Sequence, residues 1–489
     1  MSSSEPLAYY YSNELNLMEK YFIFRRYKVR LAKHVTTILF AIFYCCSIHV
    51  AQAQPAGTQS TTSANNNDAA IDVTATQDKF GLYGQFTAVG QSHSGFASPY
   101  QGQNSLKPDN NNAETTDFTL FSGMRIASGE LWINPEIDQG FGLSNTVGMA
   151  GYPSGEAYKV GANAPYLRLP RVFYRKIVNL GGEEQSIPAA ANQMERTRTA
   201  DNVILTIGKF SVVDVFDTNT YAHDPRADFF NWSVVDSGAF DYAADAWGYT
   251  KGMSVEWAQS WWTVRGGFFD LSTTPNTTVL DPTFAQHEWV GELEERHRLW
   301  GHPGKLKLLG FINRGKMGSY ADALQLASQT NSTPDTSFVR RGSSRSGFAL
   351  NLEQELASDL GAFARASANE GSKEAFDFTE INKSVSAGLS LKGDRWGHHD
   401  DTLGLALVAN GLSNAARNYF AAGGMGILIG DGQLAHDGLE KIMESYYAYA
   451  VPGLDHLTLT LNYQYVVNPA YNADRGPISF FGIRLHKEF

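Results

Sequence analysis

Apolar and polar residues alternate along many segments of about ten residues, and this alternation limits the possible folds more than any other feature of the sequence. In the first such segment Phe80, Leu82 and Phe86 fall on one face of a strand, while Tyr83 and Gln85 fall on the other. Beyond residue 77 no stretch approaches the ~18 uninterrupted apolar residues of a membrane-spanning helix. The pattern predicts strands that are dry on one side. Both a soluble sandwich and a membrane barrel contain such strands.

The spacing of these segments separates the two folds. Candidate strands lie near 80–88, 118–126, 130–137, 166–176, 203–210, 249–258, 261–271, 285–296, 304–314, 345–356, 360–369, 381–392, 402–411, 442–451, 455–466 and 478–489. Their connections alternate between short turns, such as Gln259-Ser260, and long loops, such as 211–248. We therefore predict an all-β fold, a transmembrane antiparallel β-barrel of about sixteen strands. Its long loops would be extracellular, with some of them folded into the pore.

Two connections carry more specific expectations. A two-residue turn at Ser128-Gly129 would pair Ala127 with Glu130 and place Glu130 on the polar face. The connection 177–202 is long where a short turn is expected, so it breaks the alternation. Further along, Leu459 is expected to face lipid and Thr460 to face water, where an arginine would be tolerated.

The last segment ends in an aromatic residue. Phe481, Ile483 and Leu485 occupy alternate positions, and the chain terminates at Phe489. A terminal aromatic on an alternating strand resembles the signal by which outer-membrane barrels are recognised for insertion. We therefore expect the barrel assembly machinery to be a partner through Phe489, and outer-membrane lipid to surround the barrel.

The N-terminal part reads as a targeting device followed by a tail. Within residues 1–53 a basic segment precedes the apolar run Val35 to Val50, which leads to Ala51-Gln52-Ala53, a pattern typical of a cleaved secretory signal peptide. The run 54–77 is rich in Gln, Thr, Ser and Asn and is expected to be a flexible tail. Residues 78–489 would then form the barrel, exported to the bacterial cell outer membrane. The start codon, Met1 or Met18, stays open.

The charge balance argues against nucleic acid as a partner. The chain has 39 basic and 50 acidic residues, a formal net charge of −11. A phosphate backbone needs a basic surface to bind, and an anion-selective pore would need an excess of Lys and Arg.

Because Cys45 and Cys46 lie within the apolar run of the signal peptide, the mature chain would have no thiol.

Several stretches, in order from about Lys79 to Phe489, resemble the carbohydrate-selective porins of the OprB-type family. They are NPEIDQGFGLSN (134–145), GEAYKVG (155–161), GKFS (208–211), HDPR (223–226), FNWS (230–233), AAD (243–245), GGMGILIGDG (423–432) and NPAYNADRGP (468–477). The resemblance implies a sixteen-stranded outer-membrane porin that passes small sugars by diffusion. It also implies long loops folded inward, with charged and polar side chains at the narrowing.

Sugar hydroxyls both donate and accept hydrogen bonds, so a pore that favours them needs donors and acceptors together. Arg125 would face the lumen diagonally from Glu130 and Asn134. The loop 211–248, rich in Asp and aromatic residues, would fold into the lumen, where rings could stack on sugar C–H groups. The candidate constriction residues are Arg125, Glu130, Asn134, Glu136, Asp138, Arg168, Arg171, Arg175, Asp224, Arg226 and Trp232.

Other chemistry finds little support. His398-His399-Asp400-Asp401 has metal-ligating residue types, but we place it in a short turn and expect no metal or other cofactor. The glycine run 423–432 lacks the Lys and Ser or Thr of a P-loop, and we expect an outer loop there. No catalytic triad stands out on one face, so an enzyme is not expected. The alternatives to a sugar channel are a general or weakly cation-preferring porin and a soluble secreted glycan-binding β protein. A homotrimer stays open.

Overall fold

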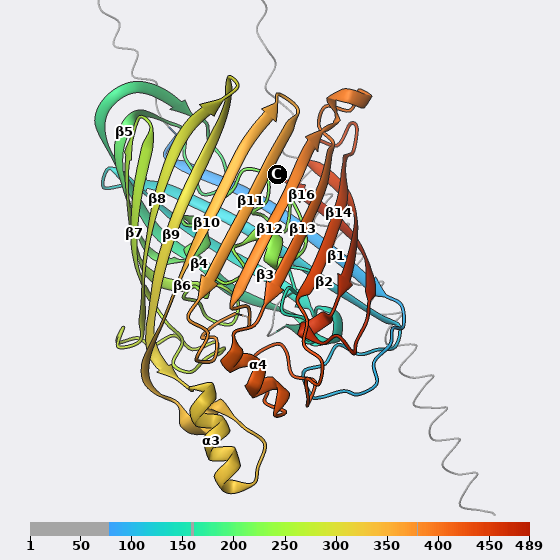
Figure 1. Cartoon of the computed structure of the whole chain (residues 1–489). Helices are drawn as coiled ribbons and strands as arrows, with labels where there is room; N and C mark the ends of the chain where they lie inside the picture. The colour runs from blue at the N-terminus through green and yellow to red at the C-terminus, as the bar shows by residue number, and fades with distance from the viewer. Residues whose placement is uncertain (1–77, 158–160, 379) are drawn as a thin grey trace, which may run out of the picture. The chain divides into compact units, whose positions relative to one another are not determined.

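The computed structural model describes residues 78–157, 161–378 and 380–489 (Figure 1). The expected signal peptide, residues 1–53, and tail, residues 54–77, lie outside the described residues. The described residues belong to one compact unit, Ala75–Phe489.

Sixteen antiparallel strands form a closed barrel in which each strand pairs with its neighbours in the sequence and β16 pairs with β1. The strands are β1 (Phe80–His93), β2 (Asn111–Ile126), β3 (Gly129–Gly140), β4 (Ala162–Ile187), β5 (Arg196–Phe210), β6 (Thr250–Gln259), β7 (Trp262–Asp270), β8 (His287–Leu299), β9 (His302–Met317), β10 (Arg341–Ala357), β11 (Leu360–Asn369), β12 (Lys383–Lys392), β13 (Thr402–Gly411), β14 (Glu440–Ala450), β15 (Leu457–Val467) and β16 (Ile478–Glu488). The predicted barrel of about sixteen strands is confirmed.

The connections differ in length at the two ends of the barrel. One end has tight turns, such as 260–261 and 300–301, and we call it the short-turn end. The other end has longer connections, such as 211–249 and 318–340. Helices α3 (Tyr320–Thr330) and α4 (Asn414–Ala421) belong to that end, as Figure 1 shows, and the short helix α2 (Trp232–Val235) lies within 211–249. No helix in the described part of the chain is both long and apolar enough to cross a membrane.

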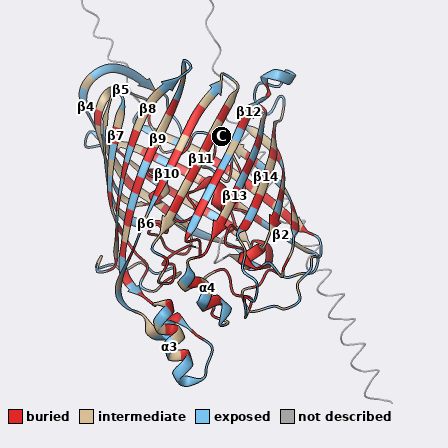
Figure 2. Ribbon diagram, in the orientation of Figure 1, coloured by how far each residue is buried: buried red, intermediate tan, exposed pale blue. Residues whose placement is uncertain are grey.

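The two faces of each strand differ in burial, as the alternating colours in Figure 2 show. On β3 the outward side chains of Ile133 and Ile137 are 40% and 46% exposed. The inward side chains of Asn134, Glu136 and Asp138 on the same strand are fully buried. Apolar residues therefore cover the outside of the barrel and polar residues line its inside, which is the reverse of a soluble protein.

The turn between β2 and β3 differs from the prediction by one residue. Ile126 pairs with Gly129 and Arg125 with Glu130, so the turn residues are Ala127 and Ser128, and both have positive φ. Two left-handed residues define the type I′ turn that suits a two-residue hairpin. Gly129 lies in β3 rather than in the turn. A larger residue would clash there, because a Cβ would lie 2.5 Å from the main-chain oxygen of Arg175 and from the Tyr174 side chain.

The prediction of a long connection at 177–202 is wrong. β4 continues to Ile187 and β5 begins at Arg196, so most of this segment is a hairpin of two paired strands. The hairpin extends past β3, because the last pair between β3 and β4 is Glu130 with Arg175. The connection itself is 188–195, and we call the part 176–201 the extended hairpin.

Candidate pore constriction

The connection 211–249 between β5 and β6 lies inside the barrel and is attached to strands around its circumference. On one side Arg226 forms ion pairs with Asp117 of β2 and Glu136 of β3, at 3.4 and 3.3 Å. Glu444 of β14, four strands round the barrel from β2, accepts a hydrogen bond from the main-chain N–H of Phe230, and on the opposite side Arg345 of β10 forms an ion pair with Asp241. The main-chain oxygens of residues 225, 227 and 228 accept hydrogen bonds from Arg484 of β16. The connection therefore crosses the interior of the barrel. We call it the inner loop.

The inner loop packs through aromatic and aliphatic side chains that are buried inside the barrel. Trp232 stacks on Tyr152 with ring centroids 5.4 Å apart and on Phe378 at 4.9 Å. Phe229 packs edge-on against Tyr446 of β14, and Phe240 packs against Phe311 of β9. The barrel thus has a core within its lumen, made by the inner loop and the inward residues of the strands.

This filling corrects the expectation for Thr460. Its side chain points inward, but it is fully buried and its hydroxyl accepts a hydrogen bond from Arg484 Nη2 at 3.2 Å. An arginine at this position would meet the Arg484 guanidinium rather than water. Inward-facing and solvated are different properties in this barrel, because the inner loop occupies part of the space.

Five of the predicted constriction residues come together where β3 and β4 meet the inner loop. Arg168 of β4 forms ion pairs with Glu136 and Asp138 of β3, and Glu136 also pairs with Arg226. Next along β4, Arg171 holds Asp214 of the inner loop through two hydrogen bonds of 2.6 and 2.8 Å. We call this group the charge cluster: Glu136, Asp138, Arg168, Arg171 and Arg226, together with Asp117, Glu156 and Asp214.

Aromatic rings and unused acceptors adjoin the charge cluster. The guanidinium of Arg168 lies 5.2 Å from the ring centre of Tyr249, and that of Arg171 lies 4.9 Å from it. Cation–π contact holds both guanidinium planes beside the ring. The buried Asp138 Oδ1 and Glu156 Oε2 receive no hydrogen bond from the described protein groups. The site therefore combines fixed donors, free acceptor atoms and aromatic faces.

Charges within the inner loop are shaped by burial and by their partners. Burial alone would raise the pKa of Asp214, but the positive charge and hydrogen bonds of Arg171 lower it below its usual value. Burial raises the pKa of Asp236 well above its usual value and lowers that of His223. Asp214 is therefore a fixed negative charge of the cluster at neutral pH.

The remaining predicted residues divide into two groups. Arg125, Glu130, Asn134 and Arg175 lie toward the short-turn end, where they contact the extended hairpin rather than the charge cluster. Asn134 donates to Asn192 Oδ1 at 2.8 Å, Arg175 donates to the main-chain oxygen of Asn192, and Glu130 accepts from the main-chain N–H of Met194. Arg125 donates to the main-chain oxygens of Asp78 and Glu195. In the inner loop, Asp224 accepts from the main-chain N–H of Arg226, and Trp232 belongs to the buried core.

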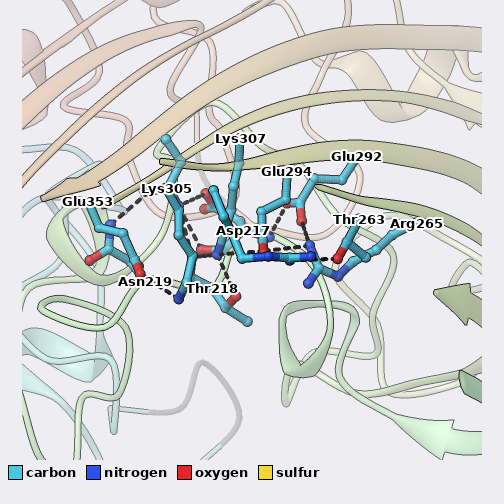
Figure 3. A network of polar contacts seen from close by, with 12 residues as sticks. Asp217, Thr218, Asn219, Thr263, Arg265, Glu292, Glu294, Lys305, Lys307 and Glu353 are labelled. Atoms are coloured by element: carbon cyan, nitrogen blue, oxygen red, sulfur yellow. Dashed lines mark hydrogen bonds and ion pairs between the residues drawn. The ribbon is translucent and has the colours of Figure 1, made fainter. Parts of the chain in front are cut away.

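A second polar network joins the beginning of the inner loop to β7–β10 (Figure 3), and the sequence analysis missed it. Arg265 of β7 forms ion pairs with Glu292 at 2.7 Å and with Glu294 at 2.9 Å, both on β8. Glu292 also accepts a hydrogen bond from the main-chain N–H of Asp217 at 2.8 Å. Lys307 of β9 donates to the Thr218 hydroxyl at 2.7 Å.

This network had a visible signal. Acidic residues recur on the polar face of the segment 285–296 at positions 288, 292 and 294, and Lys305 and Lys307 recur on the polar face of the next segment. Acidic residues at alternate positions of one strand and lysines at alternate positions of the next predict ion pairs between the two strands. The identity of their loop partners, Asp217 and Thr218, could not be read from any local pattern.

Two further segments are placed by the structure. His398 and Asp401 lie in the connection between β12 and β13, with His398 Nδ1 3.6 Å from Asp401 Oδ2. In the same connection His399 pairs with Asp394. No group of three or more metal-ligating side chains is found in the described part of the chain. The glycine run 423–432 lies between β13 and β14 and contributes the buried Leu428 and Ile429 to the core.

A closed antiparallel barrel with an apolar outside, a charged inside and a loop across its interior defines an outer-membrane channel protein. A family model for carbohydrate-selective porins, the OprB family, matches residues 103–489. The chain belongs to this family, and the predicted resemblance is confirmed.

Solved structures with a similar fold include Pseudomonas putida OprB at high pH, with 13% sequence identity and a TM-score of 0.63 over 84% of this chain and 94% of that one. The outer-membrane channel DcaP of Acinetobacter baumannii has 10% identity and a TM-score of 0.47 over 84% of this chain and 97% of that one. No curated protein sequence matches the chain.

Proposed function

We propose that this porin passes small sugars by passive diffusion and that the charge cluster forms the narrow, sugar-contacting part of its pathway. The observation that carries the proposal is the composition of the cluster. Arg171 and Asp214, which are 15% and 25% exposed, supply a donor and an acceptor that a solute can reach, and Arg168 and Arg226 hold the buried carboxylates behind them. Such mixed groups match a hydroxyl-rich neutral solute better than an ion.

The family and the rings beside the cluster support the same solute. The family model describes carbohydrate-selective porins. Tyr249 and Trp247 lie beside Arg168, with their ring centres 5.2 and 6.0 Å from the guanidinium carbon. An aromatic face next to polar groups suits a sugar ring, which has apolar C–H faces and polar edges.

A general or weakly cation-preferring porin is the alternative, and the excess of acidic over basic residues in the charge cluster favours it. Liposome swelling separates the two. We expect neutral hexoses to enter faster than amino acids of equal size, because only the sugars use both donors and acceptors. Equal rates for the two kinds of solute would replace the sugar assignment with the general porin.

The outward surface argues against the third reading, a soluble glycan-binding protein. Side chains such as Leu82, Leu407 and Leu461 are 68%, 60% and 58% exposed on the outside of the barrel. A continuous apolar band of this kind needs lipid or detergent to cover it. We propose that outer-membrane lipid surrounds the barrel, that Phe489 is recognised by the assembly machinery, and that the long connections face outside the cell.

A further inference from the structure

The extended hairpin leaves a pocket at the short-turn end of the barrel, far from the charge cluster along β3 and β4. β3 ends its pairing with β4 at Glu130 and Arg175, whereas β4 continues to Ile187 beside β5 alone. The space beyond the Ala127-Ser128 turn is therefore not filled by a strand. A pocket of about 360 Å³ lies there, and its lining includes Arg125, Ile177, Asn179 and Arg196. We call it the short-turn pocket.

The short-turn pocket carries more positive than negative charge. Arg125 and Arg196 line it, and Arg196 lies within electrostatic reach of both Arg125 and Arg198. Among the described residues, Arg196 forms a salt bridge with the buried Glu130, and Arg125 and Arg198 form none. Two guanidinium groups line the pocket against one carboxylate, and Arg198 adds positive charge nearby without lining it, so the site is short of negative charge, unlike the charge cluster, where acidic groups outnumber arginines.

The arginines also keep hydrogen-bonding capacity that the protein does not use. Arg125 donates hydrogen bonds to two main-chain oxygens, which carry no net charge. These bonds use Nε and Nη2, and among the described residues Nη1 of Arg125 donates no hydrogen bond, so its donors are available to a ligand in the pocket. A planar guanidinium with free donors fits the oxygen atoms of a phosphate or carboxylate in a forked geometry.

We propose that the short-turn pocket binds a phosphate-type oxyanion. Ile177 and Asn179 occupy the same face of β4 as the inward residue Arg175, so the pocket opens on the inner side of the extended hairpin. The oxyanion could reach it as part of a phosphorylated sugar or as a phospholipid headgroup at the rim, and both share the same chemistry. The proposal does not depend on sugar selectivity at the charge cluster.

Calorimetry with inorganic phosphate on the full-length, detergent-solubilised barrel tests the proposal. We expect saturable binding that becomes roughly tenfold weaker in Arg125→Gln, because the change removes a charge-assisted hydrogen bond, and weaker still when Arg198→Gln is added, because the pocket loses a neighbouring positive charge. Arg298→Gln is the matched control, since Arg298 is exposed at the turn between β8 and β9 on the same end. Heat-modifiable migration of each variant on a gel verifies that it is folded.

Absence of saturable phosphate binding, or equal affinity in the wild type and the double variant, overturns the proposal. Two further arms identify the source. A hexose phosphate that blocks ion current more strongly from the short-turn side than a neutral hexose does, with the block lost in Arg125→Gln, assigns the site to permeants. Phosphatidylglycerol in nanodiscs that competes with inorganic phosphate assigns it to the lipid headgroup. Either source supports the oxyanion site, and sugar diffusion can persist or fail independently of it.

Discussion

Individual side chains of the charge cluster should differ in their effect on sugars and on ions. Arg171 is 15% exposed and its partner Asp214 is 25% exposed, so a solute can reach both. Arg171→Gln should weaken sugar block of ion current roughly tenfold, because a charge-assisted hydrogen bond contributes about 1.5–3 kcal/mol. It should also raise the preference for cations, since Asp214 then lacks its partner. Planar-bilayer recordings measure both quantities.

The control for this change is Arg341→Gln, because Arg341 is 70% exposed at the beginning of β10 and pairs with Asp322 outside the barrel. It should leave sugar block unaltered. Equal weakening in both variants would mean that Arg171 acts on the fold rather than on the solute.

A single buried carboxyl should make the inner loop sensitive to pH. Burial raises the pKa of Asp228 from its usual 3.8 to about 6, although its carboxylate accepts the main-chain N–H groups of His223 and Asp224. A raised pKa means that the folded loop binds the proton more tightly than the unfolded loop. The protonated Asp228 carboxyl therefore stabilises the folded inner loop fully below pH 3.8, and this stabilisation is lost as the pH rises through about 6.

Hydrogen exchange of the inner loop measures this effect. After correction for intrinsic rates, the amides of residues 223 and 224 should be better protected at pH 5 than at pH 7, by up to roughly tenfold. In Asp228→Asn the difference should shrink, because the amide keeps one acceptor oxygen but does not titrate. Asp236 also has a raised pKa and shifts both proteins in the same direction, so the comparison isolates Asp228. An unchanged difference in the variant would assign the effect to another group.

Much of the charge cluster could be predicted at the level of single residues. Glu136, Asp138, Arg168 and Arg171 were found because alternation assigns each strand residue to a face, and neighbouring strands bring those faces together. Arg125 and Arg175 obey the same rule but lie at a different height in the barrel. Height depends on where each hairpin ends, and the ends of β4 and β5 were misjudged by more than five residues. Partners within the inner loop depend on tertiary packing, which no local pattern encodes.

The seam between β1 and β16 depends on the last residue of the chain. Gly84 and Phe489 exchange main-chain hydrogen bonds of 2.7 and 2.9 Å, and the Phe489 ring lies 5.9 Å from that of Phe118. A Cβ on Gly84 would lie 2.3 Å from the Phe489 ring, so the ring covers this glycine closely. The terminal aromatic therefore completes the closing pair of strands, besides being the expected insertion signal.

Deletion of Phe489 should lower the amount of folded, heat-modifiable barrel in outer-membrane fractions several-fold, because the seam loses two hydrogen bonds and an apolar contact. Phe489→Leu is the matched control. It keeps both main-chain bonds and most of the apolar contact, and it should fold at closer to wild-type levels. Normal assembly of the deletion variant would show that the seam tolerates an incomplete last strand.

On the scale of strands, alternation predicted nearly every element. The bounds 360–369 and 402–411 agree with β11 and β13 at both ends. The misplaced β2–β3 turn has a specific cause. Gly129 looks like a turn residue in the sequence, but it is required by the close approach of Tyr174, which lies on the next strand. A packing glycine and a turn glycine cannot be distinguished before the neighbour is known.

For the whole molecule, the apolar outside should make lipid-facing charge costly. Leu461 is 58% exposed in the middle of β15, so Leu461→Arg should lower the free energy of unfolding by about 2–4 kcal/mol. Urea unfolding of barrels refolded into lipid vesicles measures the loss. Leu461→Ala, which removes apolar area without adding charge, should cost clearly less. Similar losses in the two variants would mean that this face does not contact hydrocarbon.

The attachment of the inner loop also sets the order in which the barrel can be finished. Phe230 bonds to Glu444 across 214 residues, and Ala227 bonds to Arg484 across 257. These contacts cannot form until the last strands have been made, and closing such long loops is slow. The wall must therefore come together before its interior is sealed. Until the final hairpin is in place, the inner loop lacks its attachments to β14 and β16, and the interior of the barrel is only partly filled.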